Sequence, residues 1–204
     1  MNREKLFKEA MQVYYNERVR NITKQKIIEQ FNLTEEAFFE HFRDKEDFLR
    51  QAVDFDLEEK KIEDADIHQT AGNLIEEIIL LFRHYTKQLI NINASYFVQI
   101  QHSYPQIWRT YTRHTQMHGY YQFYDLINLG IQQGLFQRSI NLEIVTKAMI
   151  EQINVMHNTH LFPKHRYNMG EVFRSIFLYY LKGICTEKGS QLADQVFAHL
   201  VFEE

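Results

Sequence analysis

Glycine and proline are scarce in this chain of 204 residues, with seven and two occurrences. Because all-β and α/β domains need frequent turns that contain these residues, their scarcity argues against both classes. Hydrophobic residues make up 45% of the sequence, and a chain of this length can bury a sizeable core as one large domain or two small ones. The composition therefore predicts an all-α protein.

Signals for secretion, membrane insertion and catalysis are also missing. A single cysteine, Cys185, excludes an internal disulfide, and its place on an apolar-periodic segment indicates a buried thiol rather than a nucleophile. No apolar run approaches the ~18 residues of a membrane span, and the charged N-terminus lacks the apolar segment of a secretory signal. There is no glycine-rich phosphate loop, nucleophile elbow or His-Glu-x-x-His motif. We therefore expect a cytoplasmic protein without membrane association, catalytic activity or cofactor.

The charge balance gives no general sign of nucleic-acid binding. The whole chain has a formal net charge of −4, and residues 1–53 contain ten Lys or Arg and ten Asp or Glu. A DNA-binding module usually carries a basic patch, so any such patch here has to be local.

Helical periodicity runs through most of the chain. Apolar residues spaced three and four apart predict helices over 3–18, 24–31, from Thr34, from Asp44 to about 62, 73–91, 94–102, 105–133, 142–160, 168–188 and 190–202. The charged segment 58–66 is expected to be a solvated connection between a small head and a larger body.

Residues 23–49 have the layout of a helix-turn-helix. Thr23 and Thr34 are placed as the N-caps of two short helices, and Asn32 between them tolerates the left-handed conformation that often ends a helix. In such a motif the second helix normally enters a DNA major groove. The second helix here also carries Glu35, Glu36 and Glu40, which is unusual for a surface that faces phosphates.

The segment resembles the DNA-binding head of the TetR (tetracycline-repressor) family. The matching positions are Thr23, Ile27, Leu33-Thr34, Phe42, Lys45-Glu46 and Phe48-Leu49 in the head, and Gly130, Gly134 and Phe136 in the body. The resemblance implies a DNA-binding domain over 1–50 and a ligand-binding and dimerisation domain over 51–204. It implies a homodimer on a double-stranded DNA operator, most often a repressor released by a small hydrophobic or aromatic effector.

The resemblance also implies which residues contact DNA: Thr23, Lys24, Thr34, Glu35, Ala37, Phe38, His41 and Lys45. Two positions depart from the family pattern, because Glu36 replaces a glycine and Phe39 replaces a frequent tyrosine. A carboxylate that faces phosphate opposes counterion release, although Glu35 can accept a hydrogen bond from a cytosine amino group. The alternative function is a regulator-like dimer that binds a ligand or a protein, with weak or lost DNA binding.

The body contains an aromatic-rich segment over 96–124. An effector pocket there would use Tyr85, His102, Trp108, Tyr111 and His114, although aromatic side chains serve equally well as core or dimer packing. Broad apolar stripes on the two long C-terminal helices predict a dimer interface that contains Val145, Met149, Ile153, Val172, Phe173, Ile176, Phe177 and Tyr180. The histidine groups 114/118 and 157/160/165 lack a completing ligand, so no metal site is expected.

Overall fold

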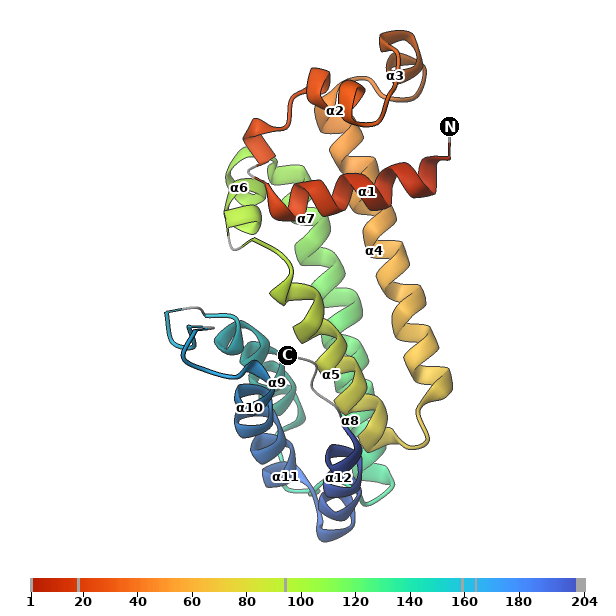
Figure 1. The fold of residues 1–204 in the computed structure, drawn as a ribbon. Helices are drawn as coiled ribbons and strands as arrows, with labels where there is room; N and C mark the ends of the chain where they lie inside the picture. The colour runs from red at the N-terminus through yellow and green to blue at the C-terminus, as the bar shows by residue number, and fades with distance from the viewer. Residues whose placement is uncertain (1, 18, 94, 159, 164, 201–204) are drawn as a thin grey trace. The chain divides into compact units, whose positions relative to one another are not determined.

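The computed structural model describes residues 2–17, 19–93, 95–158, 160–163 and 165–200, and nearly all of its regular structure is helical (Figure 1). The α-helices are α1 (Arg3–Asn16), α2 (Lys24–Gln30), α3 (Glu35–His41), α4 (Lys45–Thr70), α5 (Leu74–Ile90), α6 (Ser95–Ser103), α7 (Pro105–His114), α8 (Tyr121–Gln132), α9 (Leu142–Met156), α10 (Met169–Phe173), α11 (Tyr179–Ile184) and α12 (Glu187–His199). Within the described ranges, the extended pairing is confined to an isolated antiparallel bridge between Phe136 and Cys185. The predicted all-α class is confirmed.

Short polar side chains start most of these helices. In each case the side-chain oxygen accepts a hydrogen bond from the backbone amide three residues later, which satisfies one of the unpaired amides of the first turn. The caps are Asn2, Thr23, Thr34, Asp44, Asn73, Asn141, Asn168 and Thr186. Two turns use a left-handed residue, Asn32 with a φ of 51° and Gly134 with a φ of 70°. The predicted caps at Thr23 and Thr34 and the predicted turn at Asn32 are confirmed.

The chain divides into two compact units. The first consists of residues 1–64 and 91–115, and the second of residues 65–90 and 116–204. The chain passes between the units within α4, after α5 and at the start of the π-helical turn Thr115–Tyr120. The functional division at residue 50 that the sequence predicts stays a prediction.

Aromatic rings form the centre of the first unit. Phe42 and Phe48 meet edge to face with 4.9 Å between ring centroids, and Phe38 lies 5.3 Å from Phe42. All three side chains are buried, and buried residues of α1, α4, α6 and α7 complete the same cluster. The cluster therefore holds the short helices α2 and α3, which are too brief to be stable alone.

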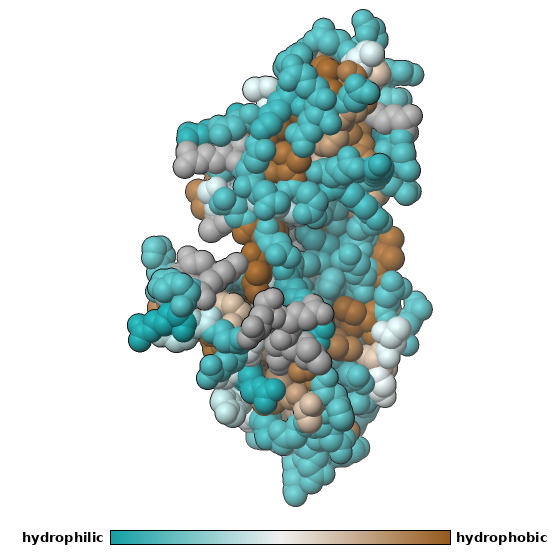
Figure 2. Space-filling model, viewed as in Figure 1, coloured by the Kyte–Doolittle hydropathy of each residue, from teal (hydrophilic) through white to brown (hydrophobic). Residues whose placement is uncertain are grey.

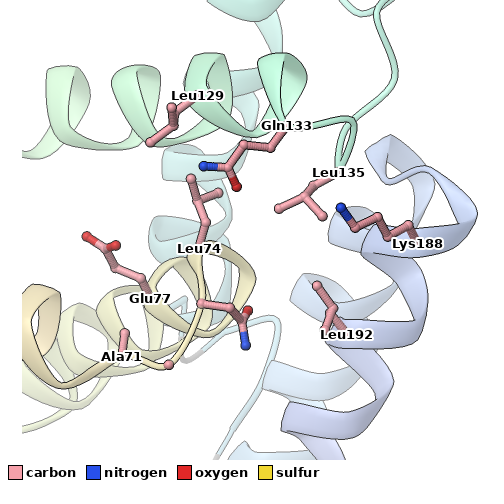
Figure 3. Close-up of a pocket in the computed structure, with 10 residues that line it drawn as sticks. Ala71, Leu74, Glu77, Leu129, Gln133, Leu135, Lys188 and Leu192 are labelled. Atoms are coloured by element: carbon pink, nitrogen blue, oxygen red, sulfur yellow. The ribbon is translucent and has the colours of Figure 1, made fainter.

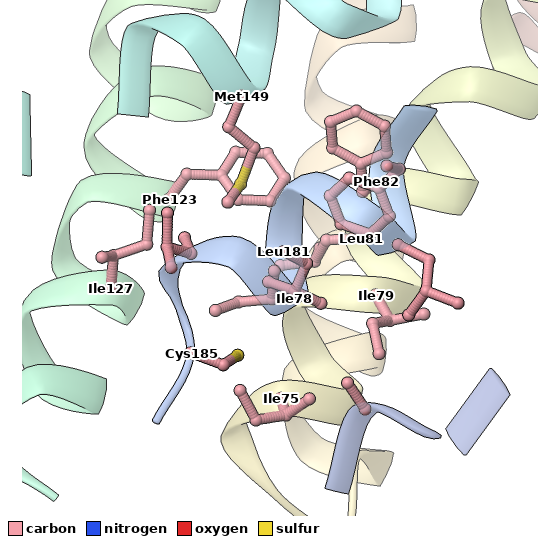
Figure 4. Close-up of a cluster of buried hydrophobic side chains, with 14 of the residues drawn as sticks. Ile75, Ile78, Ile79, Leu81, Phe82, Phe123, Ile127, Met149, Leu181 and Cys185 are labelled. Carbon is pink, nitrogen blue, oxygen red and sulfur yellow. The ribbon is translucent and has the colours of Figure 1, made fainter. Parts of the chain in front are cut away.

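The second unit has its own core, to which α5 contributes Ile75, Ile78, Ile79, Leu81 and Phe82 (Figure 4). Phe82 of α5 stacks on Phe177 of the C-terminal region, with 3.7 Å between ring centroids and 9° between ring planes. Cys185 lies in this core at 5% exposure, and burial raises the pKa of its thiol to about 12. The expectation of a buried thiol is confirmed.

The charged segment 58–66 is helical, and the predicted helix end at about residue 62 was wrong, although the chain does pass from one unit to the other within this segment. α4 continues from Lys45 to Thr70, and the chain turns at residues 71–73. Ion pairs between residues one helical turn apart stabilise this part of α4, with 2.6 Å between Lys60 Nζ and Asp56 Oδ2 and 2.5 Å between Lys61 Nζ and Glu58 Oε1. Asp64 is buried, so this part of the helix also contributes to packing.

Two other predicted helices differ in detail. The helix predicted over 105–133 consists of α7 and α8 joined by the π-helical turn Thr115–Tyr120. The helix predicted over 168–188 contains a second π-helical turn, Arg174–Leu178, and ends at Ile184. Thr186 rather than Ser190 caps the last helix, because its hydroxyl accepts a hydrogen bond from the Gly189 amide. The predicted boundaries at Ala94 and Phe202 lie outside the described residues.

The face of the molecule in Figure 2 is largely hydrophilic, with smaller hydrophobic areas between the polar side chains. Across the residues that the structure describes, no helix is long and apolar enough to cross a membrane.

Candidate nucleic-acid interface

The helix-turn-helix is built by α2, a tight turn and α3. The Thr23 hydroxyl accepts a hydrogen bond from the Lys26 amide at 3.1 Å, and the Thr34 hydroxyl accepts one from the Ala37 amide at 3.1 Å. Between them, the Leu33 amide donates to the Ile28 carbonyl at 2.9 Å across the left-handed residue Asn32. These local bonds fix the turn that sets the direction of α3 relative to α2 within the first unit.

Burial separates the two sides of α3. Phe38 has no exposed surface and packs against the rings of Phe42 and Phe48, whereas Phe39 is 52% exposed. Residues 38 and 42 are one helical turn apart and therefore share the inward side. The prediction that Phe38 contacts DNA is corrected, because its ring belongs to the core.

The other predicted DNA-contacting residues of α2 and α3 reach the surface. Thr23, Thr34, Glu35 and His41 are exposed, and Lys24 and Ala37 are half-buried. Their roles stay predictions.

Lys45 is tied to its own unit. Its ammonium donates a hydrogen bond to the Val19 carbonyl at 2.9 Å and lies 5.9 Å from the centroid of the Tyr104 ring. The side chain is half-buried, and burial lowers the pKa of its ammonium. Lys45 therefore joins the start of α4 to the turn Val19–Asn21, and its predicted phosphate contact stays a prediction.

Two arginines that sequence reasoning missed are more open to phosphates. Arg20 is exposed and forms no ion pair with any residue that the structure describes. The Arg43 side chain is 82% exposed, with its guanidinium 3.7 Å from an Asp47 oxygen. Arg20 lies in the turn Val19–Asn21 before α2, and Arg43 lies between the end of α3 and the start of α4. Their basic charge beside the motif in the sequence could have pointed to them.

A partly buried polar network joins α1 to α4 in the same unit. The Tyr15 hydroxyl donates to Asp56 Oδ2, and the Lys60 ammonium donates to the same oxygen at 2.6 Å. Close by, the Tyr96 and Tyr111 hydroxyls share a hydrogen bond of 2.7 Å. Burial raises the pKa of Tyr15, Tyr96 and Tyr111 well above the usual range for tyrosine, so their hydroxyls stay protonated hydrogen-bond donors.

The residues predicted to bind an effector fall in both units. Tyr85 lies in the second unit, where its hydroxyl donates to the Gln122 amide oxygen at 2.9 Å. His102, Trp108, Tyr111 and His114 lie on α6 and α7 of the first unit, and His102 is exposed. Tyr111 is buried and bonded to Tyr96, so its side chain serves packing in the first unit. The effector contacts stay predictions.

A pocket of about 470 Å³ lies within the second unit, between the start of α5, the end of α8 and α12 (Figure 3). Leucines form much of its lining, and Gln133 and Lys188 add polar groups. None of the five predicted effector residues lines it. Among the described residues, no group of three or more His, Cys, Asp or Glu could hold a metal ion.

The predicted dimer stripe lies mostly inside the protomer. Five of its members have at most 6% exposure and belong to the core of the second unit: Met149, Ile153, Val172, Phe173 and Phe177. These five assignments are corrected, because the apolar side of each helix packs against its own chain. Val145, Ile176 and Tyr180 are half-buried, and their place in an interface stays a prediction.

The surface of the same helices carries other apolar residues. Ile144 is 64% exposed, Val155 is 42% exposed and Tyr179 is 67% exposed. The Tyr180 hydroxyl donates to the Val145 carbonyl at 2.9 Å, so Ile144 and Tyr179 lie beside a point where α9 and α11 are joined. Sequence reasoning chose the wider apolar stripe and missed this narrower outer one.

The arrangement of helices, with a helix-turn-helix close to the N-terminus, is the fold of TetR-type transcriptional regulators. A TetR-family transcriptional regulator from Cytophaga hutchinsonii superposes with a TM-score of 0.73 at 16% identity, over 89% of this chain and 94% of that one. The fatty acid degradation regulator FadR from Bacillus halodurans has a TM-score of 0.70 at 13% identity, over 88% of this chain and 97% of that one.

A ketosteroid transcriptional regulator from Mycobacterium tuberculosis has the same fold, with a TM-score of 0.60 at 17% identity, over 92% of this chain and 96% of that one. No protein-family model and no curated protein matches the sequence. The likeness is therefore one of fold, and it confirms the fold that the resemblance implied.

Proposed function

We propose that this chain is a cytoplasmic, DNA-binding transcription regulator of the TetR family that acts as a repressor. The observation that carries the proposal is the helix-turn-helix on a fold shared with several such regulators over about nine-tenths of the chain. Residues of both its helices reach the surface, and Arg20 and Arg43 offer charges for phosphates beside it. No catalytic role is proposed.

Two further parts of the proposal are a homodimer and a small-molecule effector. A dimer fits the exposed Ile144, Val155 and Tyr179, and it would present two heads to an operator with two half-sites. One similar structure is described as a regulator of fatty acid degradation and another as a ketosteroid regulator, which favours a hydrophobic effector here. Such an effector would act by preferring the protein conformation that binds DNA less well.

A second candidate is a regulator-like dimer that binds a ligand or a protein without tight DNA contact. Glu36 and Glu40 favour it, because both are exposed on α3 and neither forms an ion pair with a residue in the described part of the chain. Each uncompensated carboxylate near phosphate weakens the electrostatic term that supplies much of DNA affinity.

One salt series distinguishes the two candidates. The full-length protein is titrated by fluorescence anisotropy against DNA from upstream of its own gene and against unrelated DNA, from low to moderate salt. For the regulator we expect preference for the upstream DNA and a steep fall of the logarithm of the binding constant with the logarithm of the salt concentration. Arg20→Ala should reduce the magnitude of this slope by about one for each head. Arg138→Ala, at an exposed arginine of the second unit, is the matched control and should leave the slope unchanged. Equal binding to both DNAs would favour the second candidate.

A further inference from the structure

Glu35 differs from the other two glutamates of α3 in forming an ion pair with a residue that the structure describes. The Lys24 ammonium of α2 lies 2.8 Å from Glu35 Oε1, and it also lies 4.7 Å from the centroid of the exposed Phe39 ring. The Lys24 side chain is 35% exposed and the Glu35 side chain 58% exposed, so the pair is open to solvent on one side. Lys24 and Glu35 are the first residues of α2 and α3, and the pair joins the two helices across the turn.

The pair fixes one carboxylate while leaving an acceptor available. Glu35 Oε1 accepts from Lys24, and no hydrogen bond to Oε2 occurs within the described residues. The neighbouring ammonium offsets the charge of the carboxylate, which lowers the electrostatic cost of bringing it towards DNA. Restricting the side chain before binding also lowers the entropy that would be lost on contact.

Resting on the proposed function, we infer that the Lys24–Glu35 pair makes Glu35 the cytosine-reading residue of the head. In the major groove, cytosine presents its N4 amino group as a donor, which suits a carboxylate acceptor. Adenine also presents an amino group, but its N7 acceptor lies beside that group and repels a carboxylate. Guanine and thymine present acceptors at the same edge. A carboxylate held at the first residue of α3 therefore selects cytosine, and Lys24 is its positioning residue.

The substitution Glu35→Gln gives a direct test, because a glutamine amide pairs with adenine through both N6 and N7. The full-length parent protein and the variant each select sites from a pool of randomised double-stranded DNA, and the selected sequences are compared by position. We expect cytosine at one position of each half-site for the parent, about tenfold favoured over other bases, and adenine at that position for Glu35→Gln. Glu35 is exposed, and circular dichroism of the variant checks that its fold is unchanged.

Two matched variants separate base reading from charge. Glu36→Gln removes a neighbouring exposed carboxylate, so it should strengthen binding to all sequences and leave the selected bases unchanged. Lys24→Met should weaken the cytosine preference severalfold while cytosine stays the favoured base, because the carboxylate remains but is no longer held.

The outcomes are distinguishable from failure of the proposed function. If the parent selects a defined operator and Glu35→Gln selects the same one, the inference is overturned while the regulator function stands. The same conclusion follows if Glu36→Gln changes the selected base and Glu35→Gln does not. If the parent selects no sequence at all, specific DNA binding itself is overturned.

Discussion

Gly130 of α8 lies directly against the aromatic ring of Phe136, with no room for a Cβ atom between them. The Gly130 carbonyl accepts hydrogen bonds from the amides of Leu135, at 2.8 Å, and Phe136, at 3.3 Å. Gly134, with its φ of 70°, lets the chain reverse between these points. The buried ring of Phe136 can therefore pack beneath the end of α8 only if residue 130 has no side chain.

We expect Gly130→Ala to destabilise the protein by about 1–3 kcal/mol, as overpacking of a filled core does. The added Cβ would overlap the Phe136 ring, and relief would require the ring or the end of α8 to move. The free energy of unfolding of the full chain in urea measures the effect. Gly183→Ala is the matched control, because that glycine is also helical and its Cβ would meet nothing within 4 Å. An equal loss for both variants would contradict the close packing.

The network around Asp56 gives a second stability prediction. The Lys60 and Asp56 side chains are only 16% and 18% exposed, and Lys60 also lies 3.0 Å from the Tyr15 hydroxyl. Lys60→Met leaves a mostly buried carboxylate without its cation, so we expect a loss of about 2–4 kcal/mol in urea unfolding. Adding Asp56→Leu should recover part of that loss, because the unpaired charge is removed.

The adjacent pair in α4 serves as the control for this network. Lys61 and Glu58 are one helical turn apart, with side chains 40% and 67% exposed. Lys61→Met should therefore change stability by less than about 0.5 kcal/mol. A double variant at positions 56 and 60 that is no more stable than Lys60→Met alone would show that the lost stability comes from packing and not from the charge.

Asp47 predicts a pH dependence at the start of α4. Burial acts to raise the pKa of its carboxyl, but hydrogen bonds from the Arg50 guanidinium, the Arg43 amide and the Gln51 amide group outweigh burial and lower it. A pKa lowered by folding adds stability above the unfolded value of about 3.9, and this stability is lost as the pH falls through the folded pKa.

We expect Asp47→Asn to lower stability by about 1–3 kcal/mol at pH 7, because it removes hydrogen bonds to a charged group. The difference from the parent should shrink below about pH 4, where the parent carboxyl is also protonated. Urea unfolding at a series of pH values measures it. Asp66→Asn, at an exposed aspartate of the same helix, is the matched control.

Local features of the sequence predicted the helix-turn-helix well. Thr23, Asn32 and Thr34 act through side-chain and backbone preferences that depend on the next few residues only, and the structure has them as predicted. The end of α4 was mispredicted: the sequence placed it at about residue 62, but the helix continues to Thr70. A run of charges resembles a linker, but pairs such as Lys61 with Glu58 support a helix when no glycine or proline intervenes.

Roles that depend on packing between distant segments could not be predicted from periodicity. Phe177 is apolar and helical, but only the fold shows that its ring stacks on Phe82 of the same chain rather than on a partner. Lys45 matched a family position, but its bond to the Val19 carbonyl depends on a turn 26 residues away. The sequence gives the apolar side of a helix, whereas the choice between core and interface needs the neighbouring helices.

Tyr179 offers a test of the proposed dimer that does not depend on DNA. Its side chain is 67% exposed beside the joint between α9 and α11, and such an exposed aromatic ring favours burial against a partner. We expect the parent to sediment as a dimer and Tyr179→Arg to shift towards monomer, because a charge at the centre of an apolar interface is costly. Tyr121→Arg, at a 49% exposed tyrosine of α8, is the matched control and should sediment as the parent does. A dimer that persists in Tyr179→Arg but dissociates in Tyr121→Arg would place the interface on α8 instead.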